Sequence, residues 1–235
     1  MPDLVDVAPA VALAVYAHPD DAEISCGGTL ARWAAAGAKV HLAVCTSGDK
    51  GSLDPAVNPR TLAKRRAKEI AAAAGALGLA GHHCLGHADG ELDNTPELRE
   101  ALVGLVRRLR PEVVICPDPT AVFFGDRYFN HHDHRSAGWA TLDAVAPAAA
   151  NPHYFPGAGR VHQVASVYLS GSLDPNAWVD IGDTLDTKVE ALFRHESQLA
   201  GAGEGFADFV RRRAEEAGRQ AGVRYAEGFR RLSFS

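Results

Sequence analysis

The sequence predicts an α/β fold: a Rossmann-like, mostly parallel sheet with helices on both faces, in three α/β/α layers. Short apolar runs alternate with helix-like segments through the first two-thirds of the chain. These runs are apolar at consecutive positions, which is typical of parallel strands buried on both faces. The chain has 235 residues, of which 46% are hydrophobic and 23% charged, and this suits a single domain over residues 1–235.

The first two-thirds of the chain predicts alternating strands and helices. Residues 11–16 (VALAVY) and 40–45 (VHLAVC) are the clearest buried strands. A helix opens at Thr95 with a capping hydroxyl and proline in the first turn. In chain order we predict a strand at 11–16, a helix at 29–36, a strand at 40–45, a helix at 60–77, a strand at 82–85, a helix from 95 and a strand at 113–116.

The last third of the chain predicts more helices and two further strands. A helix should run from after Asp133 to about Ala149, where a stretch rich in proline and glycine begins at residues 151–159. Beyond it we predict strands at 164–169 and 178–181, and helices at 183–199 and about 205–221.

The loops that follow the predicted strands indicate where a site should lie. In open α/β sheets, ligands bind beyond the carboxyl ends of the strands. The loops after the first, second and fourth strands span residues 17–28, 46–58 and 117–133, and they hold the most concentrated polar chemistry of the chain. We therefore expect the functional residues at this edge.

Two adjacent carboxylates, Asp20 and Asp21, follow His18 directly after the first buried strand. Such a pair repels and costs desolvation unless a cation or hydrogen-bond donors compensate. A divalent metal is the simplest compensation, with His18 and Asp21 binding from one side and Asp20 left beside the metal. The alternative is that one aspartate caps the following helix while His18 hydrogen-bonds within a turn.

A second cluster, Asn130-His131-His132-Asp133-His134, contains three histidines and an aspartate. Taken alone it could be a histidine-rich surface turn. Together with the first cluster, two histidines and one carboxylate give three protein ligands and an open fourth position, the arrangement of catalytic zinc. Such a site also accepts Fe²⁺ or Co²⁺.

Charge and cysteine usage argue against several other classes of protein. The net charge of -5 includes no long run of one sign, and the basic clusters at 64–66 and 211–213 lack the aromatic groove of a nucleic-acid site. The four cysteines are widely spaced without a CxxC, which suits a reducing cytoplasm. Residues 1–10 lack a basic leader, and no apolar stretch approaches the roughly 18 residues of a membrane span. We therefore expect a cytoplasmic protein.

Signatures of other enzyme classes are missing from the sequence. There is no G-x-S-x-G elbow, no phosphate-binding P-loop and no H-E-x-x-H helix. The Cys26-Gly27-Gly28 turn lacks dinucleotide-loop spacing and follows an acidic cluster that would repel a pyrophosphate.

The two clusters carry a family resemblance. Residues 18–24 (HPDDAEI) with 26–30 (CGGTL) resemble the signature of the PIG-L (LmbE-like) family of zinc-dependent N-acetylglucosaminyl deacetylases, and His131-x-Asp133-His134 matches its second motif. Weaker similarity extends through residues 46–51, Arg66-x-x-Glu69, 188–198 and 225–229.

This resemblance implies a role for each residue. The zinc ligands would be His18, Asp21 and His134. Asp20 would be the general base, and His131 would donate to the oxyanion. Asp133 would orient His131 and keep it protonated, and Arg66 would contact the acyl carboxylate product. The implied partner is a small-molecule N-acetylglucosamine-type or related N-acyl amino-sugar substrate.

Several alternatives remain open at this point. The same machinery would serve an amidase for another N-acyl amine, such as a thiol conjugate or a secondary-metabolite intermediate, and a metal-binding module without turnover is a third reading. His132 is an extra imidazole that could be an idle surface residue, a substrate contact or a competing ligand. The aromatic segment 120–129 could face a sugar ring, pack as a lid or form a homo-oligomer contact.

Overall fold

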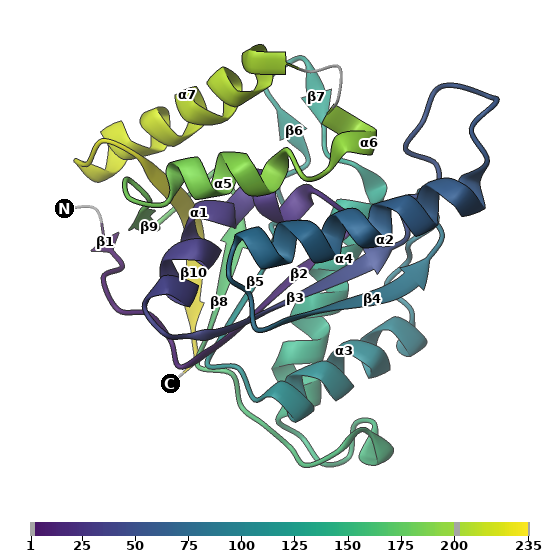
Figure 1. The fold of residues 1–235 in the computed structure, drawn as a ribbon. Coiled ribbons are helices and arrows are strands. Elements are labelled where there is room, and N and C mark those ends of the chain that lie inside the picture. Colours follow the sequence, from purple (N-terminus) through teal and green to yellow (C-terminus); the bar gives the residue numbers. More distant parts are fainter. Residues whose placement is uncertain (1–2, 200–202, 235) are drawn as a thin grey trace.

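The protein forms one eight-stranded sheet flanked by helices, seen in a computed structural model that describes residues 3–199 and 203–234 (Figure 1). The strands are β1 (Asp3–Leu4), β2 (Val11–Tyr16), β3 (Lys39–Thr46), β4 (Gly81–His87), β5 (Val113–Pro117), β6 (Phe123–Phe124), β7 (Tyr128–Phe129), β8 (Ser166–Ser170), β9 (Ala177–Asp180) and β10 (Ala226–Ser233). The helices are α1 (Asp21–Ala35), α2 (Pro59–Ala76), α3 (Pro96–Leu109), α4 (His132–Asp143), α5 (Leu185–Leu192), α6 (Glu196–Leu199) and α7 (Gly203–Ala221).

The sheet is mixed but mostly parallel, with the strand order β1-β9-β10-β8-β5-β2-β3-β4. β2 pairs in parallel with β3 on one side and with β5 on the other, so the strand order reverses at β2. β10 runs antiparallel between β8 and β9. Strands β6 and β7 form a separate two-stranded hairpin. The α/β fold predicted from the apolar runs is confirmed.

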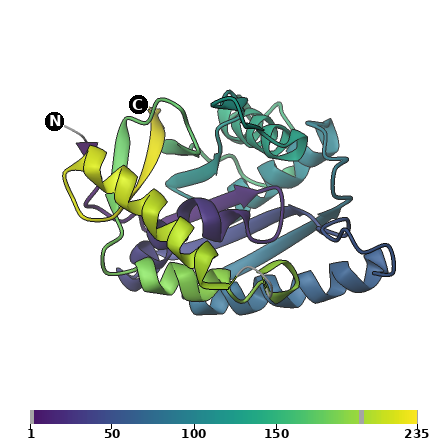
Figure 2. The ribbon, with the colours of Figure 1, turned by 90° about the horizontal axis from the view of Figure 1, so that it is seen from above.

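Consecutive residues of β2 face two different hydrophobic cores, because side chains alternate across a strand. Ala12, Ala14 and Tyr16 face a core shared with α1, α2 and α5. Leu13 and Val15 face a second core shared with α3 and α4. The sheet therefore lies between two helical layers, as the view from above shows (Figure 2). No helix of the described residues is long and apolar enough to cross a membrane.

The start of α1 differs from the prediction. The sequence predicts a loop over residues 17–28 and a helix at 29–36, but the helix begins at Asp21 and kinks at Cys26, whose φ and ψ are −144° and 18°. Glycine at 28 permits close packing of the helix: a Cβ there would lie 2.8 Å from the side chain of Ile181. The glycines thus serve contact between elements rather than a turn.

Other predicted boundaries also shift. α4 ends at Asp143 and is followed directly by a π-helical segment, η1 (Ala144–Ala149), which reaches the predicted end. This segment is interrupted at Ala146, whose φ is −139° and ψ is 120°, because a proline disfavours the helical conformation of the residue before it. The helix expected at 183–199 is two short helices, α5 and α6. The sequence did not predict β10, whose central residues include glycine and several charges.

Candidate metal centre and catalytic site

The two polar clusters meet at the crevice where the strand order reverses. His18 and Asp21 follow β2, and His131 and His134 lie at the start of α4, which follows β5. β2 and β5 are parallel neighbours, so their carboxyl ends open at the same edge. This is where open α/β sheets bind ligands.

Three donor atoms converge there: Nδ1 of His18, Nε2 of His134 and the carboxylate of Asp21. The two ring nitrogens are 3.2 Å apart. Asp21 Oδ1 lies 3.2 Å from His134 Nε2, and Asp21 Oδ2 lies 3.4 Å from His18 Nδ1. Two ligands of a tetrahedral ion bound at about 2.1 Å stand about 3.4 Å apart. The spacing therefore suits a small divalent cation.

Hydrogen bonds behind each ring orient its lone pair toward this point. His18 Nε2 lies 3.0 Å from an oxygen of Asp89 and 3.1 Å from one of Asp133, so it carries the proton and leaves Nδ1 free to ligate. His134 Nδ1 donates to Asn130 Oδ1 at 2.9 Å. The amide orientation is set by Asn130 Nδ2, which donates to the carbonyl of Ala121 at 3.0 Å. Two lone pairs and a carboxylate facing one another fit a cation, and carboxylates behind ligating histidines are typical of metal sites.

The electrostatics also favour positive charge at this point. Burial opposes a charged His18, but hydrogen bonds to Asp21 and Asp89 raise its pKa to about 11. Burial likewise opposes ionisation of Asp21, but the His134 and His18 rings hold its pKa well below the usual range. The carboxylates around His18 thus stabilise a positive charge, which a proton supplies when no metal is bound. A metal ion can replace that proton.

Asp89 was not predicted as a site residue. It follows β4, whose carboxyl end opens at the same edge, and its side chain is 13% exposed. The hydrogen bond from His18 lowers the pKa of this carboxyl. The rule that selected the other loops would have found Asp89 if it had also been applied to the loop after the third predicted strand.

Asp20, directly before Asp21, has a strained backbone conformation. Its φ is 95°, in the left-handed region that costs a residue with a side chain of order 1 kcal/mol. Although it precedes α1, its side chain makes no capping hydrogen bond; its carboxylate instead accepts from Arg66 Nη2 at 3.2 Å. Burial and the adjacent charge of Asp21 raise the pKa of Asp20 to about 7, against the opposing charge of Arg66.

Arg66 lies beneath this loop, with its side chain buried. It is 3% exposed, and its guanidinium donates to the carbonyl oxygens of Gly48 and Pro19 as well as to Asp20. Glycine is required at 48, where φ is 62° and a Cβ would lie 2.4 Å from the guanidinium. These contacts make Arg66 a support for Asp20, and its contact with the acyl product stays a prediction.

Asp133 differs from the expectation in its partner. Its carboxylate is fully buried and bonds to His18 Nε2, to the backbone N–H of Gly90 at 2.7 Å and to that of Leu92 at 3.2 Å. It therefore orients His18, whereas His131 Nδ1 accepts from the Asp133 backbone N–H at 3.2 Å. His18, His131 and Asp133 form a second group with metal-ligand spacing, but these bonds already engage both oxygens of Asp133.

The extra imidazole and the aromatic segment have clear locations. His132 Nε2 lies 3.1 Å from the exposed Asp93, and His132 belongs to neither group with metal-ligand spacing among the described residues. The aromatic segment forms the β6–β7 hairpin. Phe124 and Tyr128 of this hairpin line a cavity of about 540 Å³ that reaches Asp21 and His134. The hairpin thus contributes one wall of the cleft.

Two buried charged pairs outside the predicted site support α1. Lys188 Nζ lies 2.5 Å from Glu227 and donates to the carbonyl of Ile24 at 2.9 Å. The Glu227 carboxylate accepts from the backbone N–H groups of Gly28 and Thr29 at 3.1 and 2.7 Å. This pair satisfies backbone groups that the kink at Cys26 releases, and so fixes the segment that carries Asp21.

The second pair joins α1 to the start of α6. Glu23 and His195 are 1% and 0% exposed, and their side chains lie 3.4 Å apart. Burial opposes a charged His195, but the nearby Glu23 carboxylate raises its pKa. The sequence placed His195 and Glu227 in segments with family similarity but gave neither a role, because the partners are far apart along the chain.

Comparisons with known proteins agree with this geometry. Residues 13–145 match the PIG-L family, described as GlcNAc-PI de-N-acetylase. The chain is 34% identical over 227 residues to a diacetylchitobiose deacetylase of Thermococcus kodakarensis, covering 93% of this chain and 81% of that protein. It is 35% identical over 181 residues to a 1D-myo-inositol 2-acetamido-2-deoxy-alpha-D-glucopyranoside deacetylase of Streptomyces griseus, covering 66% of this chain and 54% of that protein.

A solved structure supports the same relationship. The N,N'-diacetylchitobiose deacetylase of Pyrococcus horikoshii aligns with a TM-score of 0.88 at 30% identity, over 96% of this chain and 84% of that one. The resemblance inferred from the two motifs is therefore confirmed. With more than half of its length matched by the family and most of it aligned to one deacetylase, the chain belongs to the PIG-L family of GlcNAc-PI de-N-acetylases.

Proposed function

We propose that the protein is a zinc-dependent deacetylase that hydrolyses the N-acetyl group of an N-acetylglucosamine-type sugar to acetate and the free amine. The observation that carries the proposal is the convergence of two histidine lone pairs and the carboxylate of Asp21, with the charge of Asp21 acting on the adjacent Asp20. A pure binding site has no need of a strained, non-ligating carboxylate with a pKa of about 7. The names of the relatives supply the N-acetylated sugar.

In this proposal His18, Asp21 and His134 hold the ion. Two imidazoles and one carboxylate would be its protein ligands, a set that is typical of catalytic zinc. A bound divalent ion supplies Lewis acidity, which polarises the acyl carbonyl and makes water a better nucleophile near neutral pH.

Asp20 moves the proton. A base is most effective when its pKa lies near the working pH, and burial with the neighbouring Asp21 gives Asp20 this property. It accepts a proton from the attacking water and returns it to the amine nitrogen as the C–N bond breaks. Arg66 holds the carboxylate in place through the bond at 3.2 Å.

His131 stabilises the oxyanion that develops on the acyl oxygen. Its Nδ1 accepts from the Asp133 backbone N–H, so the proton of the neutral ring lies on Nε2, which can donate to that oxyanion. Burial and the nearby His18 lower the pKa of His131, which favours this neutral form. The carboxylate of Asp133 bonds to His18 instead of His131 and orients the His18 ring.

The test is release of free amine and acetate from a panel of N-acetyl sugars, N-acyl thiol conjugates and other N-acyl amines, using zinc-loaded protein. We expect turnover of N-acetylglucosamine or its glycosides, abolished by a chelator and restored by zinc. Turnover confined to the other N-acyl amines would replace the sugar assignment with the amidase. Metal binding without turnover of any substrate would reduce the protein to a binding module.

A further inference from the structure

The cleft that reaches the metal site is lined largely by apolar side chains. Its volume is about 540 Å³, and its lining includes Ile24 of α1, Pro117 of β5, Phe209 of α7, and Phe124 and Tyr128 of the hairpin. The centroids of the Phe124 and Tyr128 rings lie 5.7 Å apart. One water molecule occupies about 30 Å³ in the liquid, and a methyl group is of similar size. An acetyl group would therefore fill only a small part of this cleft.

Several polar groups that line the cleft are already engaged within the protein. The Tyr16 hydroxyl bonds to Ser170 Oγ at 2.7 Å, and Ser170 Oγ donates to a backbone carbonyl at 3.3 Å. Asn130 accepts from His134 Nδ1 and donates to a backbone carbonyl. A group rich in hydroxyls would compete with these bonds, whereas an apolar group needs no partner.

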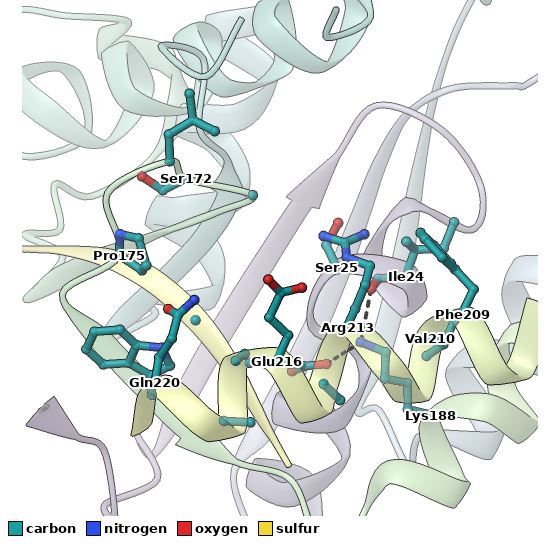
Figure 3. A pocket seen from close by; sticks show the side chains of 18 of the residues that line it. Ile24, Ser25, Ser172, Pro175, Lys188, Phe209, Val210, Arg213, Glu216 and Gln220 are labelled. Atoms are coloured by element: carbon teal, nitrogen blue, oxygen red, sulfur yellow. Dashed lines mark hydrogen bonds and ion pairs between the residues drawn. The ribbon is translucent and has the colours of Figure 1, made fainter. Parts of the chain in front are cut away.

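The cleft opens into an outer cavity of about 350 Å³ along α7. Four side chains line both spaces and lie on the side of the outer cavity away from Pro175 (Figure 3): Ile24, Ser25, Phe209 and Arg213. The Arg213 guanidinium lies 5.8 Å from the centroid of the Phe209 ring. Arg213 therefore places a positive charge where the two spaces join, whereas the stretch between this point and the metal site has mostly apolar walls.

The positions of Asp20 and His131 indicate which part of an amide points into the cleft. The carbonyl carbon of an amide carries three groups: the oxygen, the amine nitrogen and the acyl chain. In the proposed function the nitrogen faces Asp20, which protonates it, and the oxygen faces His131. Neither of these residues lines the cleft, whereas Asp21 and His134 do. The acyl chain is therefore the group directed into the cleft, and the sugar lies with its nitrogen on the side of Asp20.

We propose that the cleft is an acyl pocket, and that the protein removes unbranched medium-length acyl chains from an amino sugar more efficiently than it removes acetyl. This inference rests on the proposed function, from which it takes the roles of Asp20 and His131. Ile24 and the rings of Phe124 and Phe209 pack along the chain. One water molecule is consumed, the C–N bond breaks, and the products are the carboxylate of the chain and the protonated amine.

The first test measures kcat/KM of the zinc-loaded protein for glucosamine carrying an N-acetyl, N-butanoyl, N-hexanoyl or N-octanoyl group. Burial of one methylene is worth about fourfold in affinity, so we expect kcat/KM to rise by up to this factor for each added methylene. The octyl glycoside of N-acetylglucosamine carries a similar chain on the glycosidic oxygen, and it should show no such rise over N-acetylglucosamine. Values that stay level or fall beyond acetyl would overturn the acyl pocket while leaving the deacetylase intact, as would an octyl glycoside that matches or exceeds N-octanoylglucosamine.

Two neighbouring phenylalanines of β6 provide a matched comparison. Phe124 lines the cleft, whereas Phe123 is 70% exposed and lines neither cavity. Phe124→Ala should lower the ratio of kcat/KM for N-octanoylglucosamine to that for N-acetylglucosamine by about tenfold, and Phe123→Ala should leave this ratio unchanged. Phe209→Ala removes a ring of α7 from the cleft and should also lower the ratio, which keeps the test decisive if Phe124→Ala disturbs the hairpin. Equal ratios in all three variants would overturn the acyl pocket.

Binding supplies a measurement that needs no turnover. Calorimetric titration of the zinc-loaded Asp20→Asn protein should give a Kd that falls from N-acetylglucosamine to N-octanoylglucosamine. Chelator-treated protein should show the same trend, because side chains of the cleft rather than the ion contact the chain. A Kd that does not change with chain length would overturn the acyl pocket. A Kd that falls with chain length, while the natural protein hydrolyses none of these amides, would support the pocket and overturn the proposed function.

Discussion

Asp20→Asn is the substitution that separates metal binding from catalysis in this site. Asparagine tolerates the left-handed backbone nearly as well as aspartate, so the φ of 95° should persist. Its side-chain oxygen can still accept from Arg66, which now lies 3.2 Å away. The variant therefore removes the basicity of residue 20 and little else. We expect kcat to fall by about 10²–10⁴, the contribution of a general base, while stoichiometric metal is retained.

The same substitution has an expected effect on stability, with a sign set by the pKa. In the metal-free protein, burial raises the pKa of Asp20 from 3.8 to about 7. A carboxyl with a raised pKa destabilises the fold progressively as pH rises from its unfolded value through the folded one. Above pH 7, the free energy of unfolding of metal-free Asp20→Asn should therefore be about 2–4 kcal/mol higher than that of the natural protein. The difference should vanish as the pH falls to the pKa that Asp20 has in the unfolded chain.

Three assays decide the matter: elemental analysis for metal, amine release for turnover, and urea unfolding of chelator-treated protein at two pH values. Asp93→Asn is the matched control, because it removes an exposed carboxylate at the same edge, paired with His132. Near-normal turnover by Asp20→Asn would refute the assignment of the base. Loss of the metal would instead make Asp20 a ligand, and a stability difference independent of pH would refute the electrostatic reasoning.

Three further predictions address the metal and the support of α1. His134→Ala should lose stoichiometric metal in elemental analysis, whereas the control His132→Ala should keep it. Full retention of metal by His134→Ala would mean that another histidine is the ligand. Because the pKa of His18 is about 11 without metal, metal binding near neutral pH should release a proton, and the metal affinity should rise about tenfold per pH unit. Calorimetry in buffers of different ionisation enthalpy measures this release, and detecting none would contradict the prediction. Lys188→Met leaves the buried Glu227 carboxylate without its counter-ion and should lower the free energy of unfolding, measured in urea, by about 3–5 kcal/mol. The control Lys64→Met changes an exposed lysine and should alter this free energy by less than about 0.5 kcal/mol. Equal losses in the two variants would argue against the role of the Lys188–Glu227 pair.

Much of the fold could be predicted because its signals are local. The runs at 11–16 and 113–116 became β2 and β5 almost unchanged, since buried parallel strands are apolar at every position. Thr95 caps α3 as expected, accepting from the Leu98 N–H at 3.3 Å. β10 was missed because it carries Glu227, whose burial depends on Lys188 and on backbone groups of α1. Nothing within the strand itself indicates those partners.

The sequence by itself determined which polar residues meet and at which edge of the sheet they meet. His18 and Asp21 follow one parallel strand, and His134 opens the helix after its neighbour, so the carboxyl-end rule brings them together across 116 positions. Only the tertiary structure decided how each side chain is held. It placed Asp89 behind His18, turned Asp133 from the expected His131 toward the same ring, and packed Arg66 beneath Asp20. The physical reason is that the positions of strands along the chain follow from short-range patterns of burial, whereas ring tautomers and carboxylate partners depend on distances between side chains remote in the chain.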